Sequence, residues 1–200
     1  MKKRIAVLVS GGGTNLQALI DAQLRDELGG GEIVAVISSK AGAYALERGA
    51  RVGIPGYVLP RKEFASNQAM TVALVELLKE LRIDLVVLAG CMVIFTEELV
   101  AAYPNAIMNV HPALIPSFCG PGYYGLHVHE KALEYGVKLS GATVHFVSEE
   151  CDGGPIIAQK AVAVRPDDTP ETLQKRVMVE AEWVLLPQAV ETVAYSLSHR

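Results

Sequence analysis

The stretch Arg4–Asn15, which reads RIAVLVSGGGTN, joins an apolar run to a glycine turn and to the first residue of a helical pattern. Arg4–Val9 lacks the alternation of a half-exposed strand, and this indicates a strand that is buried on both faces. Asn15–Leu28 carries leucine and isoleucine at helical spacing, which predicts the helix that follows. A strand, a glycine turn and a helix in this order are typical of the first unit of a parallel α/β sheet.

The same alternation of strand and helix continues through the first half of the chain. Apolar runs predict strands, and segments with helical spacing predict the helices between them. The predicted strands are Ile33–Ile37, Tyr57–Leu59 and Leu85–Ala89, and the predicted helices are Tyr44–Val52, Asn67–Leu81 and a helix from the N-cap Thr96 to Ala102. Repeated units of this kind predict an α/β fold with a Rossmann-like, mostly parallel sheet flanked by helices.

The second half of the chain no longer alternates strictly between predicted strands and helices. Its predicted strands are Ala106–His111, Ala142–Val147 and Ile156–Val164, and Val128–Tyr135 is predicted as a helix. The last two strands are separated only by a short loop, which favours an antiparallel excursion in the C-terminal half. A final helix is predicted from Pro170 towards Ser196, with Pro187 as a kink or break.

Composition excludes several classes of protein. The 200 residues carry a formal net charge of −4, which argues against a nucleic-acid surface because phosphate binding needs clustered lysine and arginine. No apolar run reaches about 18 residues, so no membrane span is expected, and the N-terminal apolar run is too short for a signal peptide. The cysteines Cys91, Cys119 and Cys151 are odd in number and widely spaced, as expected of reduced thiols in a cytoplasmic protein.

Three polar groups stand out as candidates for catalysis. Asn109 and His111 are two residues apart, so a strand over Ala106–His111 places both side chains on one face. Pro112 cannot continue the strand and leaves both groups at its carboxyl end, where ligands bind in parallel sheets. The segment Cys151–Pro155 (CDGGP) adds the carboxylate of Asp152. An amide, an imidazole and a carboxylate can together stabilise an oxyanion and transfer a proton.

The glycine turn Ser10–Asn15 has the physical features of a phosphate site. Its backbone can approach a ligand closely, and the following helix offers free N–H groups and a partial positive charge. The third glycine of a dinucleotide-binding motif would fall at Leu16, and the lysine of a Walker A loop is absent. A glycine turn without a ligand is the alternative interpretation.

Four segments together resemble the phosphoribosylglycinamide formyltransferases, small folate-dependent enzymes of purine synthesis. The segments are Val7–Gln17 (VLVSGGGTNLQ), Leu88–Met92 (LAGCM), Asn109–Pro116 (NVHPALIP), and Gly141–Val147 (GATVHFV) with Asp152–Ile157 (DGGPII). The resemblance covers nearly the whole chain. It implies one domain of the formyltransferase fold over residues 1–200, with a phosphate-binding half of about 1–104 and a catalytic, folate-binding half of about 105–200.

The resemblance also implies a reaction and a set of site residues. The family transfers a formyl group from 10-formyltetrahydrofolate to the amine of glycinamide ribonucleotide, as a monomer or homodimer and without a metal. Catalysis falls to Asn109, His111 and Asp152. The nucleotide is expected at Gly12, Gly13, Thr14, Asn15 and Glu182, with Glu180 as an alternative because one extra residue follows Arg176. The folate is expected at Asn67, Met92, Val93, Ile94, Phe95, Asn109, Ser148, Glu149, Glu150, Cys151 and Asp152.

The sequence departs from the family pattern at three places. Val93 stands where relatives usually have arginine, and Asn67 stands where they usually have a basic residue. Both departures remove cationic partners of the folate tail. The loop Ser117–Leu126 is longer than the compact family form, and we expect it to reshape the folate side of the site.

The residues favour direct attack of the amine on the formyl carbon, because no motif for a protein nucleophile is present. Three alternative functions remain open at this point. A formyltetrahydrofolate deformylase shares the polar trio but adds an N-terminal domain, and a methionyl-tRNA formyltransferase adds a C-terminal RNA-binding domain. A non-catalytic nucleotide-binding module explains the glycine turn but not the trio. His127, His129 and His145 are interpreted as structural or hydrogen-bonding histidines rather than zinc ligands.

Overall fold

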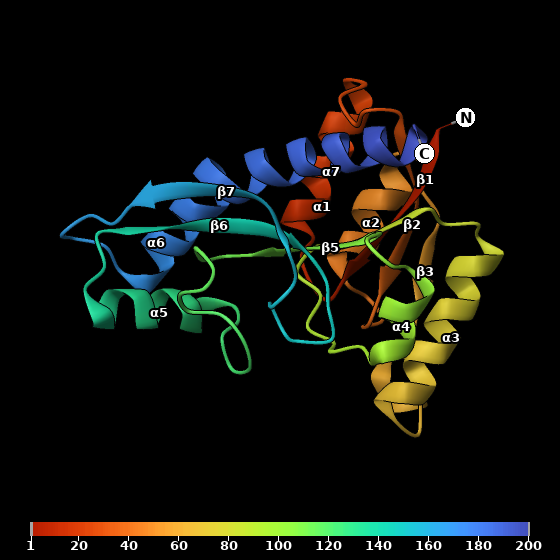
Figure 1. Ribbon diagram of the computed structural model, residues 1–200, viewed down its shortest axis with the longest axis horizontal. Coiled ribbons are helices and arrows are strands. Elements are labelled where there is room, and N and C mark those ends of the chain that lie inside the picture. Colours follow the sequence, from red (N-terminus) through yellow and green to blue (C-terminus); the bar gives the residue numbers. More distant parts are fainter. Residues whose placement is uncertain (1, 200) are drawn as a thin grey trace.

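The computed structural model describes residues 2–199, which form a seven-stranded sheet with helices on both faces (Figure 1). The strands are β1 (Lys3–Val9), β2 (Gly31–Ser38), β3 (Gly56–Val58), β4 (Leu85–Leu88), β5 (Ile107–His111), β6 (Leu139–Phe146) and β7 (Ile156–Ala163). Their order across the sheet is β3-β2-β1-β4-β5-β6-β7. The pairs from β3 to β5 are parallel, whereas β6 is antiparallel to both β5 and β7. The predicted fold class, including the antiparallel excursion, is confirmed.

The helices agree with most of the predicted ranges. They are α1 (Thr14–Leu24), α2 (Tyr44–Arg51), α3 (Asn67–Glu80), α4 (Glu97–Ala102), α5 (Leu126–Tyr135), α6 (Pro170–Val177) and α7 (Trp183–Ser198). A short 3-10 turn over Arg61–Glu63 precedes α3, and a π-helical turn over Met178–Glu182 joins α6 to α7. Within residues 2–199, none of the helices combines the length and hydrophobicity needed to cross a lipid bilayer.

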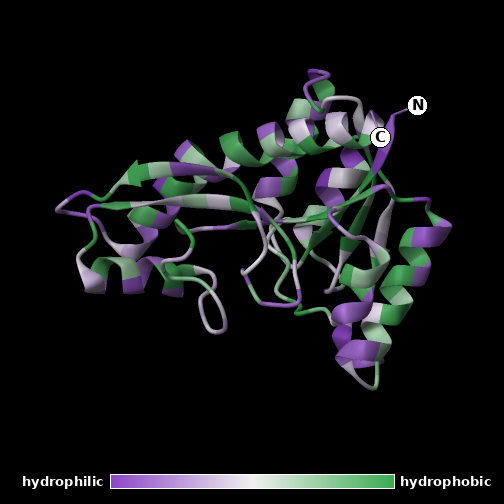
Figure 2. Cartoon of the chain, in the orientation of Figure 1, coloured by the Kyte–Doolittle hydropathy of each residue, from purple (hydrophilic) through white to green (hydrophobic). Residues whose placement is uncertain are grey.

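The alternation of side chains along β1 explains the two layers of helices. Ile5, Val7 and Val9 belong to one buried cluster, which also contains residues of α1, α6 and α7. Ala6 and Leu8 point to the opposite cluster, which is completed by α3 and α4. Figure 2 shows the strands mostly in green, the hydrophobic colour. A strand that is buried on both faces needs an unbroken apolar run, as the sequence indicated.

Two predicted features are wrong in detail. The first helix ends at Leu24 rather than Leu28, because Asp26 adopts a left-handed conformation with φ 59° and the chain turns. This turn lets Leu28, which is 2% exposed, pack into the core. The last helix continues through Pro187 without a break. The irregularity lies earlier, in the π-helical turn Met178–Glu182.

The topology defines where a ligand can bind. Strands β2 and β3 lie on one side of β1, and β4 to β7 lie on the other, so the order of strands reverses between β1 and β4. Ligands of open α/β sheets bind outside the carboxyl ends of the strands at such a point. The loops that follow β4, β5 and β6 converge below the centre of the sheet in Figure 1.

Candidate active site

The glycine turn after β1 is held from one side by α2. The backbone N–H of Ala45 donates to the Gly11 carbonyl (3.2 Å), and Nε of Arg48 donates to the Gly12 carbonyl (2.8 Å). Gly13 has φ 70°, and a Cβ there would lie 2.6 Å from the Cβ of Ala45, so only glycine fits. The carbonyl groups of the turn are thus satisfied by α2, while the first N–H groups of α1 have no acceptor within the helix. This arrangement suits an anion.

Asn15 and Glu182 form a buried pair beside the glycine turn. Nδ2 of Asn15 donates to Oε2 of Glu182 (2.6 Å), and each residue is 7% exposed. Oδ1 of Asn15 is buried without a hydrogen-bond partner among the described residues. Glu180 is exposed to solvent. The structure therefore places Glu182, and not Glu180, against Asn15, and it leaves an amide oxygen there that can accept a hydrogen bond from a ligand.

Asn109, His111 and Asp152 meet at the carboxyl end of β5, as the sequence predicted. Nδ1 of His111 lies 3.5 Å from Oδ2 of Asp152, and Nδ2 of Asn109 lies 3.5 Å from Oδ1. Asp152 lies in the turn of the loop after β6, with φ 56°. Two residues later only glycine fits, because a Cβ on Gly154 would lie 1.8 Å from the Phe146 carbonyl oxygen. An amide, an imidazole and a carboxylate therefore lie around one point.

The long loop before α5 contributes two backbone groups to this cluster. The Phe118 carbonyl lies 2.8 Å from Nε2 of His111 and accepts its proton, because a carbonyl cannot donate. The N–H of Gly120 donates to Oδ2 of Asp152 (2.9 Å). The predicted influence of this loop thus extends to the catalytic candidates themselves. One loop fixes the His111 ring and one oxygen of the Asp152 carboxylate.

The surroundings of Asp152 favour its ionised form. Burial alone would raise the pKa of this carboxyl. Hydrogen bonds from His145 and Gly120, together with the charges of His111 and His145, outweigh burial and hold the pKa of Asp152 below its usual range. Asp152 is therefore a carboxylate at neutral pH, and its negative charge faces the imidazoles of His111 and His145.

His145 and Thr143 are site residues that sequence reasoning missed. In the β5–β6 register, His145 lies opposite Asn109 and Thr143 lies opposite His111. Nδ1 of His145 donates to the Phe146 carbonyl (2.8 Å), and its Nε2 lies 3.1 Å from Nδ2 of Asn109 and 3.6 Å from Oδ1 of Asp152. Thr143 donates to the Ala113 carbonyl (2.7 Å) and supports the loop after β5. The signal that could have found them is the cross-strand partnership of an antiparallel pair.

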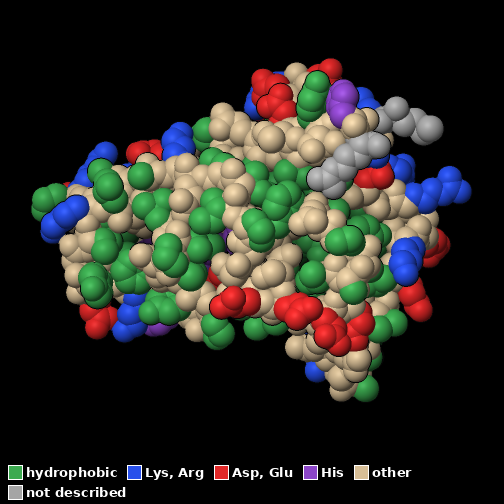
Figure 3. Space-filling model, in the orientation of Figure 1, with side chains coloured by type: hydrophobic (Ala, Val, Ile, Leu, Met, Phe, Trp, Pro, Cys, Tyr) green, Lys and Arg blue, Asp and Glu red, His purple; other side chains and the backbone are tan. Residues whose placement is uncertain are grey.

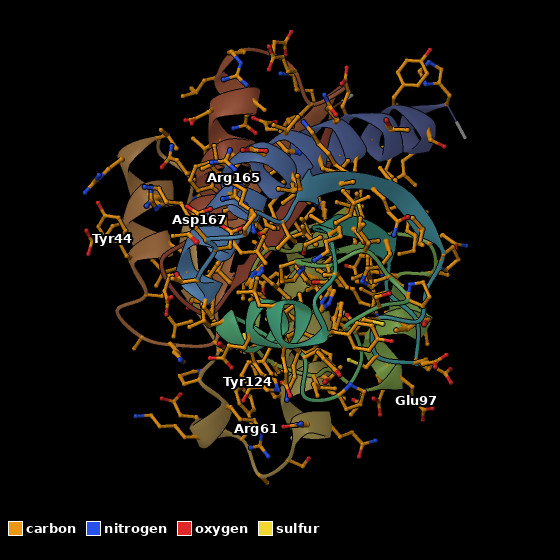
Figure 4. The ribbon with its side chains drawn as sticks, turned by 90° about the vertical axis from the view of Figure 1, so that its left-hand side faces the viewer. Tyr44, Arg61, Glu97, Tyr124, Arg165 and Asp167 are labelled. Atoms are coloured by element: carbon orange, nitrogen blue, oxygen red, sulfur yellow. The ribbon has the colours of Figure 1, made fainter. Side chains whose placement is uncertain are left out.

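The predicted folate loops flank the cluster. Met92 and Ile94 are exposed at the loop after β4. Nδ2 of Asn67 donates to the Ile94 carbonyl (3.4 Å), and Arg61 donates to Oδ1 of Asn67. A guanidinium group thus lies beside this loop although Val93 and Asn67 carry no charge. In Figure 4, Arg61 and Tyr124 both lie in the lower half of the molecule, with Tyr124 above Arg61.

The remaining residues predicted to bind the folate precede Asp152 in the loop between β6 and β7. Ser148 donates to the Glu150 carbonyl (3.1 Å), while Glu149, Glu150 and Cys151 are exposed. Figure 3 shows acidic side chains along the lower edge of the molecule. Burial and the Asp152 carboxylate raise the pKa of the Cys119 and Cys151 thiols, so neither is an activated nucleophile.

The other histidines of α5 differ in their surroundings. His127 is partly exposed and pairs with Glu130 through Nδ1 (3.1 Å). His129 is fully buried, and both of its ring nitrogens lack a partner among the described residues. Burial and, secondarily, the charge of His111 lower the pKa of His129 to about 4. His129 is therefore neutral near pH 7.

Known proteins resemble this chain in sequence and structure. The family described as formyl transferase matches residues 3–190. The trifunctional purine biosynthetic protein adenosine-3 of Drosophila pseudoobscura pseudoobscura is 45% identical over 195 residues, which are 96% of this chain but only 14% of that protein. The phosphoribosylglycinamide formyltransferase of Haemophilus influenzae is 41% identical over 189 residues, which cover 94% of this chain and 86% of that protein.

The solved structures include enzymes of similar length. The glycinamide ribonucleotide transformylase 1 of Symbiobacterium toebii superposes with a TM-score of 0.91 at 42% identity, covering 98% of this chain and 89% of that one. The phosphoribosylglycinamide formyltransferase of Brucella melitensis has a TM-score of 0.88 at 43% identity, covering 97% and 96%. The chain therefore belongs to the formyl transferase family, within its group of phosphoribosylglycinamide formyltransferases.

Proposed function

We propose that this protein transfers the formyl group of 10-formyltetrahydrofolate to the amine of glycinamide ribonucleotide in purine biosynthesis. The observation that carries the proposal is the meeting of Asn109, His111 and Asp152 at the carboxyl edge of the sheet, the same edge at which the glycine turn follows β1. The family membership supports the same reaction. The glycine turn and the first turn of α1 would hold the phosphate, and the Asn15–Glu182 pair would face the glycinamide part.

The proposed chemistry needs no covalent enzyme intermediate. The amine nitrogen attacks the formyl carbon, a new C–N bond forms, and the bond from that carbon to the folate nitrogen breaks. The folate supplies the formyl group, and the chain supplies charge and proton transfer. Asn109 donates to the developing oxyanion, since its 3.5 Å contact with Asp152 is long enough to be given up. His111 stabilises the same charge as an imidazolium.

The position of Asp152 indicates the route of proton transfer. This carboxylate takes a proton from the attacking amine, directly or through one water, and delivers it to the leaving folate nitrogen. Its lowered pKa keeps Asp152 ionised at neutral pH, so an unprotonated oxygen is present to take up the proton. The Phe118 carbonyl holds the Nε2 proton of His111. Donation from that nitrogen to the oxyanion therefore requires Phe118 to release this bond.

The test is an assay with 10-formyltetrahydrofolate in the presence and absence of glycinamide ribonucleotide. The proposal expects formylated nucleotide and tetrahydrofolate in equal amounts, and only when the nucleotide is present. Formate released without the nucleotide would instead identify a deformylase. Binding of both compounds without any turnover would identify a non-catalytic module. Either of these outcomes contradicts the proposal.

Changes in the first turn of α1 are expected to weaken nucleotide binding selectively. Thr14→Ala and Asn15→Ala each remove a polar side chain beside the proposed phosphate and amine sites. We expect about tenfold weaker binding of glycinamide ribonucleotide or more, because a hydrogen bond to a charged group contributes about 1.5–3 kcal/mol. Folate affinity should remain unchanged. Calorimetry measures both affinities, with the exposed Thr192→Ala as control; an unchanged nucleotide affinity would contradict the phosphate site.

Glu182→Gln is expected to separate stability from binding. Burial raises the pKa of Glu182 above its ordinary value near 4.5, and the Asn15 hydrogen bond counters this only in part. The folded state therefore binds a proton more tightly than the unfolded state, so ionisation of Glu182 destabilises the fold as the pH rises above that value. The neutral glutamine removes this cost. We expect the variant to unfold at a higher temperature at pH 7 and to bind the nucleotide more weakly.

The measurement is thermal unfolding of both proteins between pH 4 and 8, without nucleotide. The advantage of Glu182→Gln should grow as the pH rises from about 4.5. Calorimetry then gives the nucleotide affinity, which should fall about 10- to 100-fold if the carboxylate contacts the substrate. A pH-independent difference in stability would show that Glu182 is not destabilised by burial.

A further inference from the structure

Ser10 connects the two loops that the proposed function assigns to different substrates. It is the first residue after β1 and is only 5% exposed. Its backbone N–H donates to the Gly90 carbonyl (3.2 Å). Its hydroxyl oxygen accepts from the backbone N–H of Met92 (2.8 Å) and lies 2.7 Å from the hydroxyl of Ser39, which follows β2. The glycine turn begins directly after Ser10, and the predicted folate loop begins at Met92.

The hydrogen-bond pattern around Ser10 defines the role of its hydroxyl. The Met92 N–H can only donate, so the Ser10 oxygen is the acceptor in that bond. The bond between Ser10 and Ser39 can run in either direction. The hydroxyl is thus shared by the ends of β1 and β2 and by the loop after β4. A buried group that is shared in this way is costly to remove, because both partners lose a hydrogen bond.

The hydrogen bond between Ser10 and Met92 lies where the two proposed substrate loops meet. It crosses from β1 to β4, where the strand order of the sheet reverses. The glycine turn lies on one side of it and the Met92–Phe95 loop on the other. A change in the spacing of these two loops changes the distance between the nucleotide amine and the formyl carbon. Misplacement of reacting groups by about 1 Å can cost about 100-fold in rate.

We propose that Ser10 is a positioning residue for formyl transfer, which fixes the folate loop relative to the nucleotide loop through its hydrogen bond to Met92. This inference rests on the proposed function. It adds a residue that contacts neither substrate and acts through the backbone of Met92. It also implies that the two substrates strengthen each other's binding, because each one orders a loop that is tied to the other.

A matched pair of variants isolates the bond to Met92. Ser10→Ala removes the hydrogen bonds to both Met92 and Ser39, whereas Ser39→Ala removes only the Ser10–Ser39 bond. We expect Ser10→Ala to lower kcat by about tenfold, which is less than the roughly 100-fold cost of a 1 Å misplacement. Ser39→Ala should change kcat by less than about twofold, since its loss leaves the Met92 bond intact. Equal effects of the two variants on kcat would overturn the proposal.

A second measurement tests the coupling without turnover. The affinity for glycinamide ribonucleotide is measured with and without tetrahydrofolate, which carries no formyl group. In the wild type and in Ser39→Ala the folate should tighten nucleotide binding by about 5-fold or more, the usual lower range for coupled sites. In Ser10→Ala this ratio should fall towards one. A ratio that survives in Ser10→Ala would contradict the role of Ser10.

Amide hydrogen exchange at Met92 tests the bond itself. Exchange should be slow in the wild type and in Ser39→Ala, and faster in Ser10→Ala. This readout does not depend on activity or on either ligand. If the wild type fails to transfer formyl groups, the proposed function is wrong. If the wild type is active and Met92 exchanges equally fast in all three proteins, the inference about Ser10 alone is wrong.

Discussion

Replacing His111 with alanine should lower kcat at least about 100-fold, the usual scale for one acid–base group, while the affinities for both substrates change little. His111 is 4% exposed and lies 3.5 Å from the Asp152 carboxylate. In the proposed mechanism it carries the positive charge that stabilises the oxyanion, which exists only after the amine has attacked. An interaction made only in the transition state affects turnover rather than binding.

The control for this prediction is His127→Ala, which removes a partly exposed imidazole from α5. It should leave kcat unchanged. His111→Gln is a second variant, because glutamine can still donate to the Phe118 carbonyl and preserve the loop. It should remain slow, since it cannot carry the charge. Near-wild-type turnover in His111→Ala or His111→Gln would contradict the assignment.

Asp152→Asn should also lower kcat at least about 100-fold, because asparagine cannot accept the proton of the attacking amine. The substitution keeps the shape of the side chain and an oxygen for the N–H of Gly120. It also removes the negative charge that lies 3.5 Å from Nδ1 of His111. Both proposed contributions of Asp152 are therefore lost together. Steady-state kinetics with each substrate in turn separates kcat from KM.

The pH dependence of folding stability provides a second test of Asp152. Asp152 has a lowered pKa in the folded protein, so its ionised form stabilises the fold at neutral pH, and this stability is lost as the pH falls through the folded pKa. Asp152→Asn should therefore lose stability relative to the wild type at pH 7 and approach it in acid. Asp167→Asn, an exposed carboxyl that Figure 4 places apart from Tyr124 and Arg61, is the matched control.

A double variant tests whether the two residues act as a unit. If His111 and Asp152 work on the same proton and charge, His111→Ala combined with Asp152→Asn should cost little more than the worse single change. Full additivity of the two losses in log kcat would indicate independent roles. Unfolding measurements on all three proteins show whether a loss of activity reflects a loss of structure.

The parallel half of the fold was predictable because its signals are local. The apolar run Arg4–Val9 and the glycine turn after it define a buried strand and a helix start within a dozen residues. The end of α1 was not predictable in this way. Leu28 fits a helical stripe, but the chain turns at Asp26 so that Leu28 can fill the core. Helical spacing alone does not distinguish these two ways of burying one leucine.

The candidate site was predictable only where sequence spacing fixes geometry. The two-residue spacing of Asn109 and His111 placed them together on β5, and the structure brings Asp152 to them as expected. His145 was interpreted as a structural histidine because its partner depends on the β5–β6 register. The contacts of Phe118 and Gly120 come from a long loop with several left-handed residues, whose path no periodic pattern defines.

The choice between Glu180 and Glu182 shows the same limit. Counting back from Pro187 favours Glu182. One extra residue in the helix would rotate the side chains beyond it by about 100° around the helix axis, so the sequence does not show which glutamate faces Asn15. In the structure a π-helical turn spans Met178–Glu182, and Glu182 accepts a hydrogen bond from Asn15. A π-turn has no reliable signature in a single sequence, so three-dimensional structure was needed to choose between the two carboxylates.

The most direct test is a structure of the protein with glycinamide ribonucleotide and a folate analogue that carries a non-transferable group in place of the formyl group. The account predicts the phosphate on the N–H groups at the start of α1 and the amine about 3–3.5 Å from the analogue's acceptor carbon. It also predicts that Asn109, His111 and Asp152 contact the reacting atoms directly or through one water. Ligands bound elsewhere, or an amine turned away from all three side chains, would contradict it.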